Sequence, residues 1–176
     1  MKFFKNTFFL LFICISHFGF SQEEKTMEWN VSKKLSWSDF KDNPPASSPI
    51  AAVTASGISY EFSAVSDVGK MDIDFNVHAY FYPEKSWYRP KVCNNLILSH
   101  EQLHFDITEL FARKMRNELS AKTFTANIKT EVKVIYERII KELSEYQELY
   151  DNETNFSRNT GKQLQWNKKI VSALAK

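Results

Sequence analysis

The strongest constraint on the fold of this chain is a pair of histidines one helical turn apart. They lie in the segment Ser99-His100-Glu101-Gln102-Leu103-His104-Phe105-Asp106, which reads H-E-x-x-H. In this pattern two imidazoles bind zinc from one face of a helix, and the glutamate beside them activates water. The chain contains four histidines, so this pairing around a glutamate is not expected by chance. The segment is therefore predicted to be a helix that carries a metal site.

Apolar residues recur at helical spacing around the motif and predict a helix from about Lys91 to Ser120. Its inward stripe consists of Leu96, His100, Leu103, Ile107, Leu110 and Phe111. Residues four apart differ by about 40° around the axis, so both imidazoles can reach one ion, while Glu101 is offset and can hold a water. The competing interpretation is a hydrogen-bonded pair of core histidines, but each buried imidazole would then need a partner of its own.

Two further acids follow the motif on the same helix. Asp106 and Glu109 lie about 200° and 140° further round than His104, so neither is placed to complete its coordination sphere. We expect Asp106 to support the site from outside the coordination sphere or to have a structural role. We expect Glu109 to form an i,i+4 surface pair with Arg113.

Two segments before this helix have the pattern of β-strands. Residues 51–64 are rich in β-branched and aromatic side chains, and Gly57 is predicted to bend or bulge that strand. Residues 71–82 alternate between an apolar and a polar face, so the two segments are predicted to form a hairpin. His78 lies on the polar face, where a surface or aromatic-packed side chain is the simpler interpretation, but it is also a candidate third metal ligand.

The remaining segments complete one α+β domain. Trp37 and Phe40 are expected to attach an N-terminal arm to the body. Apolar residues every three or four positions from Val132 to Leu149 predict a second long helix that packs on the first, and a short helix follows around Trp166. The predicted fold is a small antiparallel sheet, a hairpin, packed on long helices, with a zincin-like H-E-x-x-H helix.

Residues 1–21 have the composition of a secretory signal peptide. Lys2 and Lys5 precede an apolar run, and small residues stand near a predicted cleavage after Ser21. A transmembrane anchor is the alternative, but the apolar run is short for a bilayer span. We therefore expect residues 22–176 to form a single zinc-protease-like domain, secreted or periplasmic, without a membrane span.

Removal of this segment changes the charge of the chain. The full sequence has a formal charge of +2, and loss of Lys2 and Lys5 leaves equal numbers of basic and acidic residues. A neutral domain gives no indication of a nucleic-acid partner. Cys93 would be the one remaining thiol of an exported protein, so no internal disulfide is expected, and Cys93 is predicted to be buried and inert.

Short motifs spread over nearly all of the predicted mature chain form a recognisable set. They are Leu35-Ser36-Trp37-Ser38-Asp39-Phe40, Ser86-Trp87, His100 to Ile107 with Glu109, Ala112 and Arg113, and a tail with Tyr150, Asp151, Glu153, Thr154, Gln163 and Trp166. This set resembles a bacterial family known as domain of unknown function 922, whose members are described as secreted zinc-dependent proteases. The resemblance implies a Zn²⁺ cofactor and a peptide or protein substrate.

The chain departs from this resemblance at one position. The family tail reads Tyr-Asp-x-x-Thr-x-His, and Phe156 stands where that histidine is expected. If the histidine is the third zinc ligand of the family, this chain lacks it, because phenylalanine cannot bind metal. Catalytic zinc needs three protein ligands plus water, so Glu153, Asp151 or His78 could take its place. Two imidazoles could instead hold zinc weakly, or the domain could have lost catalysis.

The leading hypothesis is an exported zinc-dependent metallopeptidase. His100 and His104 would hold Zn²⁺, which lowers the pKa of water toward about 7, and Glu101 would take the proton and pass it to the leaving amine. The alternative is a catalytically impaired or dead relative that acts as an exported binding module. Such a module would use its aromatic residues or its polar strand face to contact a cell-envelope partner.

Overall fold

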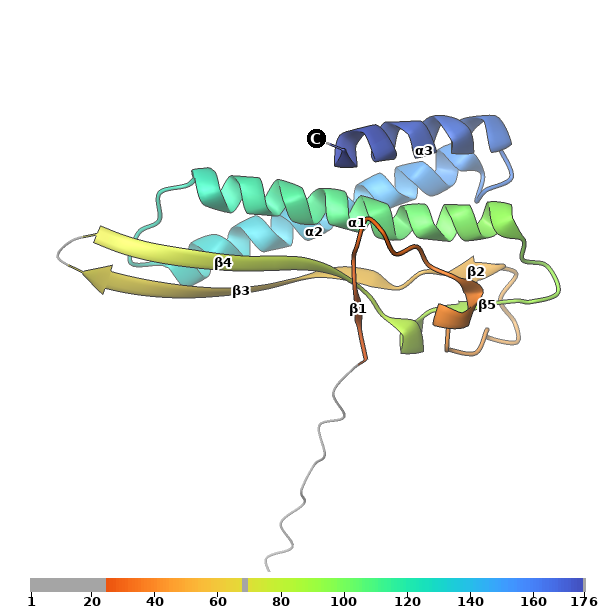
Figure 1. The fold of residues 1–176 in the computed structure, drawn as a ribbon, viewed down its shortest axis with the longest axis horizontal. Helices are drawn as coiled ribbons and strands as arrows, with labels where there is room; N and C mark the ends of the chain where they lie inside the picture. Colours follow the sequence, from red (N-terminus) through yellow and green to blue (C-terminus); the bar gives the residue numbers. More distant parts are fainter. Residues whose placement is uncertain (1–24, 68–69, 176) are drawn as a thin grey trace, which may run out of the picture.

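The computed structural model describes residues 25–67 and 70–175 (Figure 1). The predicted signal peptide, residues 1–21, lies outside the described residues. No helix in the described ranges is long and apolar enough to cross a membrane. Over these residues the fold is α+β, with small antiparallel sheets and three α-helices. The elements are β1 (Met27–Glu28), β2 (Ala52–Val53), β3 (Ser56–Asp67), β4 (Lys70–Phe81), β5 (Trp87–Tyr88), α1 (Asn95–Ala121), α2 (Ile128–Thr154) and α3 (Thr160–Leu174).

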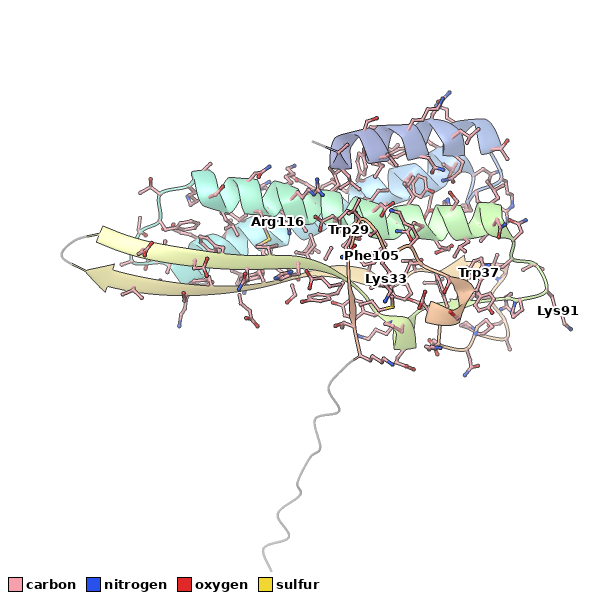
Figure 2. The ribbon with its side chains drawn as sticks, in the orientation of Figure 1. Trp29, Lys33, Trp37, Lys91, Phe105 and Arg116 are labelled. Carbon is pink, nitrogen blue, oxygen red and sulfur yellow. The ribbon has the colours of Figure 1, made fainter. Side chains whose placement is uncertain are left out.

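The predicted hairpin is confirmed. β3 and β4 pair antiparallel from Ser56–Phe81 to Asp67–Lys70 without a break in register, and β1 pairs with the last residues of β4 to give the strand order β1-β4-β3. The apolar face of β4 is also as predicted, because Val77, Ala79 and Phe81 are buried under the helices. Phe105 of α1 packs on Phe81 at a centroid distance of 5.8 Å, between the helix and the sheet (Figure 2).

The first strand differs from its prediction, because it is interrupted at Thr54-Ala55 and not at Gly57. Thr54 Oγ1 donates to the carbonyl of Glu101 on α1, and the Ala55 amide donates to Ser86 Oγ. These bonds join Thr54 to α1 and Ala55 to the β4–β5 loop. The two residues therefore separate β2 from β3. Gly57 stays in register, and a Cβ at this position would come within 3.2 Å of the Tyr82 ring.

Helix α1 is the central element of the fold. It contacts β2, β3 and β4 on one side and α2 and α3 on the other (Figure 1). The helix begins at Asn95, four residues later than predicted, because the Asn94 side chain accepts hydrogen bonds from the amides of Leu96 and Ile97. An N-cap of this kind satisfies amides that have no partner within the helix.

The two C-terminal helices complete the core as predicted. Helix α2 buries Val132, Ile139 and Tyr150, and α3 buries Trp166 and Ile170. Between the two helices the chain makes a left-handed turn in which Asn155, Phe156 and Ser157 have φ values of 48°, 51° and 71°.

The N-terminal arm is attached where the sequence predicts. Trp37 stacks on Tyr88 with ring centroids 4.6 Å apart, and Phe40 packs on Phe81. Earlier in the arm, Trp29 lies beside α1 (Figure 2), and its indole Nε1 donates to Asp106 Oδ1 at 2.7 Å. The arm therefore depends on both apolar packing and one buried carboxylate of the central helix.

The prediction of a surface Glu109–Arg113 pair is wrong in one respect. The pair exists, with Arg113 Nε 3.0 Å from Glu109 Oε1, but Arg116 Nη2 also lies 2.6 Å from the same oxygen, and Glu109 is buried. Helical spacing alone places Glu109 near Arg113. The packing of β4 over this part of α1 removes the carboxylate from solvent, and Arg116 also donates to the Val77 carbonyl of β4.

Candidate metal centre

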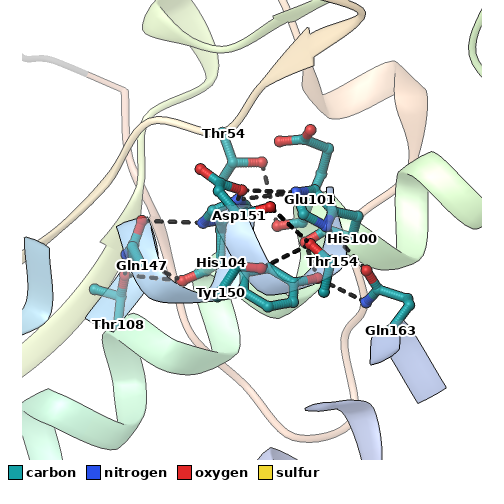
Figure 3. A network of polar contacts seen from close by, with 10 residues as sticks. All are labelled: Thr54, His100, Glu101, His104, Thr108, Gln147, Tyr150, Asp151, Thr154 and Gln163. Atoms are coloured by element: carbon teal, nitrogen blue, oxygen red, sulfur yellow. Dashed lines mark hydrogen bonds and ion pairs between the residues drawn. The ribbon is translucent and has the colours of Figure 1, made fainter. Parts of the chain in front are cut away.

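His100 and His104 lie on the side of α1 that faces α2 and α3, and both are buried, with 4% and 8% of their surface exposed. Their Nε2 atoms are 3.2 Å apart, and each lies 3.0 Å from Oδ1 of Asp151 on α2 (Figure 3). Three potential ligand atoms thus meet at one point between two helices. Among the described residues, this His100–His104–Asp151 group could hold a metal ion.

Two glutamines determine which imidazole nitrogen carries the proton. His100 Nδ1 lies 2.9 Å from Gln163 Oε1, and His104 Nδ1 lies 3.0 Å from Gln147 Oε1. The amide nitrogens of both glutamines are used elsewhere, since Gln163 Nε2 donates to Tyr150 Oη and Gln147 Nε2 donates to Thr108 Oγ1. Each Oε1 is therefore an acceptor, and each histidine Nδ1 donates. In a neutral imidazole the other nitrogen, Nε2, then carries a lone pair.

With the Nδ1 atoms protonated, the two Nε2 lone pairs and the Asp151 carboxylate form a cluster of three acceptors. A cation would stabilise such a cluster at a largely buried position, as either a proton shared among the three groups or a metal ion. A side chain that holds the outer nitrogen of a metal-binding histidine in this way is a common feature of metal sites. The donor set of two nitrogens and one carboxylate oxygen suits a divalent transition metal.

The dimensions of the cluster fit a tetrahedral ion. Ligand atoms about 2.0–2.1 Å from a tetrahedral zinc stand about 3.3–3.4 Å apart. The three edges observed here are 3.0, 3.0 and 3.2 Å. Side-chain shifts of a few tenths of an ångström would therefore bring the three atoms to the spacing of one face of the tetrahedron.

The close approach of Asp151 to the two imidazoles shifts the pKa values of Asp151 and His104. Burial would raise the pKa of Asp151, but the hydrogen bonds and charges of His100 and His104 outweigh it and hold that pKa well below its usual range. Burial would lower the pKa of His104, but the hydrogen bond to Asp151 and the negative charges of Glu101 and Asp151 raise it above the usual value. The site therefore attracts positive charge.

Tyr150 supports His100 from beneath. Its ring stacks on the His100 imidazole at a centroid distance of 4.5 Å, and its hydroxyl donates to the His100 carbonyl and accepts from Gln163 Nε2. Burial raises the pKa of Tyr150 well above its usual range, so the phenol stays protonated. The ring and the Gln163 amide hold the imidazole in one orientation.

Glu101 is also buried, with 5% of its surface exposed, and it lies beside the group in Figure 3. It shares a cavity of about 500 Å³ with His100, His104 and Asp151. The walls of the cavity come from α1, from residues 49–54 and from the turn after α2. A carboxylate and a potential metal site therefore face a space that is open to a small ligand or to a short segment of a chain.

The other predicted site residues lie elsewhere. His78 is on the open face of β4, with Nδ1 2.6 Å from Glu28 Oε1. Glu153 accepts from Trp166 Nε1 at 3.0 Å and pairs with Lys162. Asp106 accepts from Trp29, Lys34 and Gln102, so its carboxylate joins the N-terminal arm to α1. Of the three candidate third ligands, the structure brings Asp151 to the imidazoles.

Sequence reasoning missed the two glutamines as partners of the histidines. Gln163 belongs to the tail motif, but the motif gives it no role. Gln147 precedes Asp151 by four residues, so the two share one face of α2, and this spacing was a signal that could have identified it. The contact of each amide with a particular imidazole depends on how the helices pack.

Comparison with family models matches part of the chain to a described bacterial family. The sequence model of a family described as "Bacterial protein of unknown function (DUF922)" matches residues 84–158. No curated protein and no solved structure matches the chain. The matched segment begins before α1 and ends after the left-handed turn, so it includes both histidines, Glu101, Asp151 and Phe156. Residues 84–158 therefore carry the sequence pattern of this bacterial family of unknown function.

Proposed function

We propose that this protein is an exported zinc-dependent metallopeptidase with a zincin-like H-E-x-x-H helix. The observation that carries the proposal is the meeting of His100 Nε2, His104 Nε2 and Asp151 Oδ1 at mutual distances of 3.0–3.2 Å. The buried Glu101 lines the same cavity. Export rests on the composition of residues 1–21.

His100, His104 and Asp151 would hold the zinc ion and leave a fourth position open toward the cavity, as catalytic zinc requires. A zinc ion bound there would lower the pKa of water to about 7 and polarise a carbonyl. Zinc is preferred over iron or manganese because H-E-x-x-H joins the two histidines to a general base. The third ligand atom comes from Asp151, so Phe156 does not weigh against a complete site.

Glu101 is the proposed general base. In peptide hydrolysis its carboxylate accepts a proton from water as the oxygen bonds to the scissile carbonyl carbon. The same carboxyl group then gives that proton to the nitrogen as the carbon–nitrogen bond breaks. Its burial next to the proposed metal site favours this role, because it keeps the carboxylate close to the place where the proton is released.

Metal analysis of the purified protein tests the metal part of the proposal. We expect one zinc per chain, and we expect it to be lost in His100→Ala and Asp151→Ala. His78→Ala is the matched control, because that histidine lies outside the cavity, and it should retain zinc. Folded wild-type protein that takes up no zinc would contradict the proposal, and preferential uptake of iron or manganese would change the identity of the metal.

The Glu101→Gln variant tests the catalytic part. The amide has nearly the same size as the carboxylate but cannot accept the proton, so we expect zinc content to be retained and peptide hydrolysis to fall at least about a hundredfold. Hydrolysis is measured with a mixture of short peptides followed by mass spectrometry. A variant as active as the wild type would exclude Glu101 as the base. The absence of hydrolysis in a zinc-loaded wild type would favour a binding module.

A further inference from the structure

The cavity next to the metal group, which consists of His100, His104 and Asp151, has an apolar side. The chemistry proposed above does not use that side. Pro49, Ile50, Val53, Ile97 and Phe156 all line it. Phe156 and Ile50 are 54% and 50% exposed, and both are among the exposed large apolar side chains of the described structure. An exposed phenylalanine at the wall of a cavity is a suitable contact for an apolar group of a ligand.

The backbone conformation that places Phe156 at the cavity wall is energetically unfavourable. Its φ of 51° lies in the left-handed region, which is unfavourable for a bulky residue, and the residues on either side share this conformation. The turn is stabilised by backbone hydrogen bonds from Phe156 to Asp151 at 2.9 Å and from Asn159 to Thr154 at 2.8 Å. Local strain that the surrounding structure maintains points to a role for the side chains it positions.

The same turn brings Arg158 to the cavity. Within the described part of the chain, its guanidinium has no hydrogen-bonding or ionic partner, whereas the guanidiniums of Arg89, Arg113, Arg116 and Arg138 all donate hydrogen bonds. The other charged groups of the lining are Glu101 and Asp151. A divalent ion would balance these two carboxylates, so Arg158 would leave the loaded cavity with a positive charge.

We propose that the turn after α2 selects the substrate, with an apolar side chain packed on Phe156 and a carboxylate bound by Arg158. This inference rests on the proposed peptidase function and names its substrate class, a peptide with an apolar residue next to a carboxylate. A guanidinium binds a carboxylate through two parallel hydrogen bonds, which suits a planar anion at the end of a chain. The carboxylate could be a peptide C-terminus or an aspartate or glutamate side chain.

Peptide binding to zinc-loaded protein tests the proposal without requiring turnover. The probes are acetyl-Ala-Ala-Phe with a free carboxylate, the same peptide as its amide, and acetyl-Ala-Phe-Asp amide, and calorimetry in the Glu101→Gln background gives their affinities. We expect one of the two carboxylate peptides to bind about tenfold more tightly than the amide. The peptide that does so identifies the source of the carboxylate.

Variants assign this preference to the two residues. Arg158→Gln should reduce the carboxylate preference to less than about twofold, and the matched control Lys168→Gln, an exposed lysine on α3 that does not line the cavity, should leave it unchanged. Phe156→Ala should weaken binding of phenylalanine peptides about fivefold relative to alanine peptides. Leu164→Ala, which removes a 60% exposed leucine outside the cavity, should have no such effect.

The outcomes separate this inference from the function on which it rests. An unchanged carboxylate preference in Arg158→Gln would place the carboxylate on the metal and overturn the role of Arg158. Equal effects of Phe156→Ala and Leu164→Ala would overturn the apolar contact. Selective peptide binding without hydrolysis would contradict the peptidase function but support the role of the turn after α2. Hydrolysis without such selectivity would support the peptidase function and contradict the role of the turn.

Discussion

Two of the clusters of buried ionisable groups on helix α1 differ in how their charges are balanced, and the difference is informative. At Glu109 the carboxylate lies 3.0 Å from Arg113 Nε and 2.6 Å from Arg116 Nη2, so the chain itself supplies the opposite charge. At His100 and His104 the converging atoms are two imidazole nitrogens and a carboxylate oxygen. In the first cluster the chain supplies the opposite charge, whereas the second is a group of acceptors that could hold a metal ion. Burial of charge therefore does not by itself indicate a metal site, and the proposal rests on the convergence of three acceptor atoms at one point.

Removal of the metal should cause the largest loss of stability among the changes considered for these two clusters. A chelator leaves the three acceptors with at most a shared proton, so we expect a loss of about 4 kcal/mol of stability if the free metal is about a thousandfold above its dissociation constant. Thermal unfolding with and without chelator measures the loss. Asp151→Asn is the control and should be nearly insensitive to chelator. Equal melting temperatures of the wild type with and without chelator would show that the acceptors do not hold a metal.

The Glu109→Gln variant tests the compensated cluster. It leaves two guanidiniums without their buried partner, and because both are partly exposed we expect a moderate loss of about 2 kcal/mol. Denaturant unfolding of the metal-loaded protein measures the loss. The zinc content should stay at the wild-type value, since this cluster is separate from the metal group. A loss of zinc in Glu109→Gln would mean that the two clusters are coupled.

The Gln147→Leu variant examines how the metal group is supported. It removes the acceptor of the His104 Nδ1 proton, so the imidazole loses its orientation, and we expect metal affinity to fall about tenfold. Competition with a chromophoric chelator gives the affinity. Gln165→Leu, at an exposed position on α3, is the matched control and should bind as the wild type does. If both variants bind metal equally well, the hydrogen bond from His104 to Gln147 has no effect on the site.

The strain at Phe156 should appear as a smaller effect. Glycine adopts the left-handed conformation without penalty, so Phe156→Gly should be more stable than Phe156→Ala by about 1 kcal/mol, although glycine is usually the less stabilising residue. Chemical denaturation of the two variants measures this difference. A more stable alanine variant would show that the turn relaxes when the phenylalanine is removed.

The pH dependence of stability should reverse when metal is bound. The raised pKa of His104 gives the metal-free protein a stabilisation that is complete below 6.5, the ordinary value, and is lost as the pH rises through the folded-state pKa. The lowered pKa of Asp151 contributes stability above 3.8 that is lost only as the pH falls further. Metal binding requires unprotonated imidazoles, so metal-loaded protein should gain stability with rising pH. From pH 6.5 upward the melting temperature of the metal-free protein should fall and that of the metal-loaded protein should rise. Parallel curves for the two forms would contradict this prediction.

Much of the fold follows from local patterns. The alternation along β4 and the apolar periods of α1 and α2 predict these elements because each pattern repeats within two to four residues. Their bounds are less predictable, and the break at Thr54 is an example. It results from hydrogen bonds to Glu101 and Ser86, and these partners are distant in the sequence.

The candidate site shows the same division between sequence and structure. The sequence by itself determined that His100 and His104 share a face of one helix, because a separation of four residues places two side chains about 40° apart on any α-helix. It did not choose among Asp151, Glu153 and His78. Only the tertiary structure brought Asp151 to the imidazoles and directed Glu153 to Trp166. The register between α1 and α2 depends on the packing of the whole core, and no local spacing along the chain encodes it.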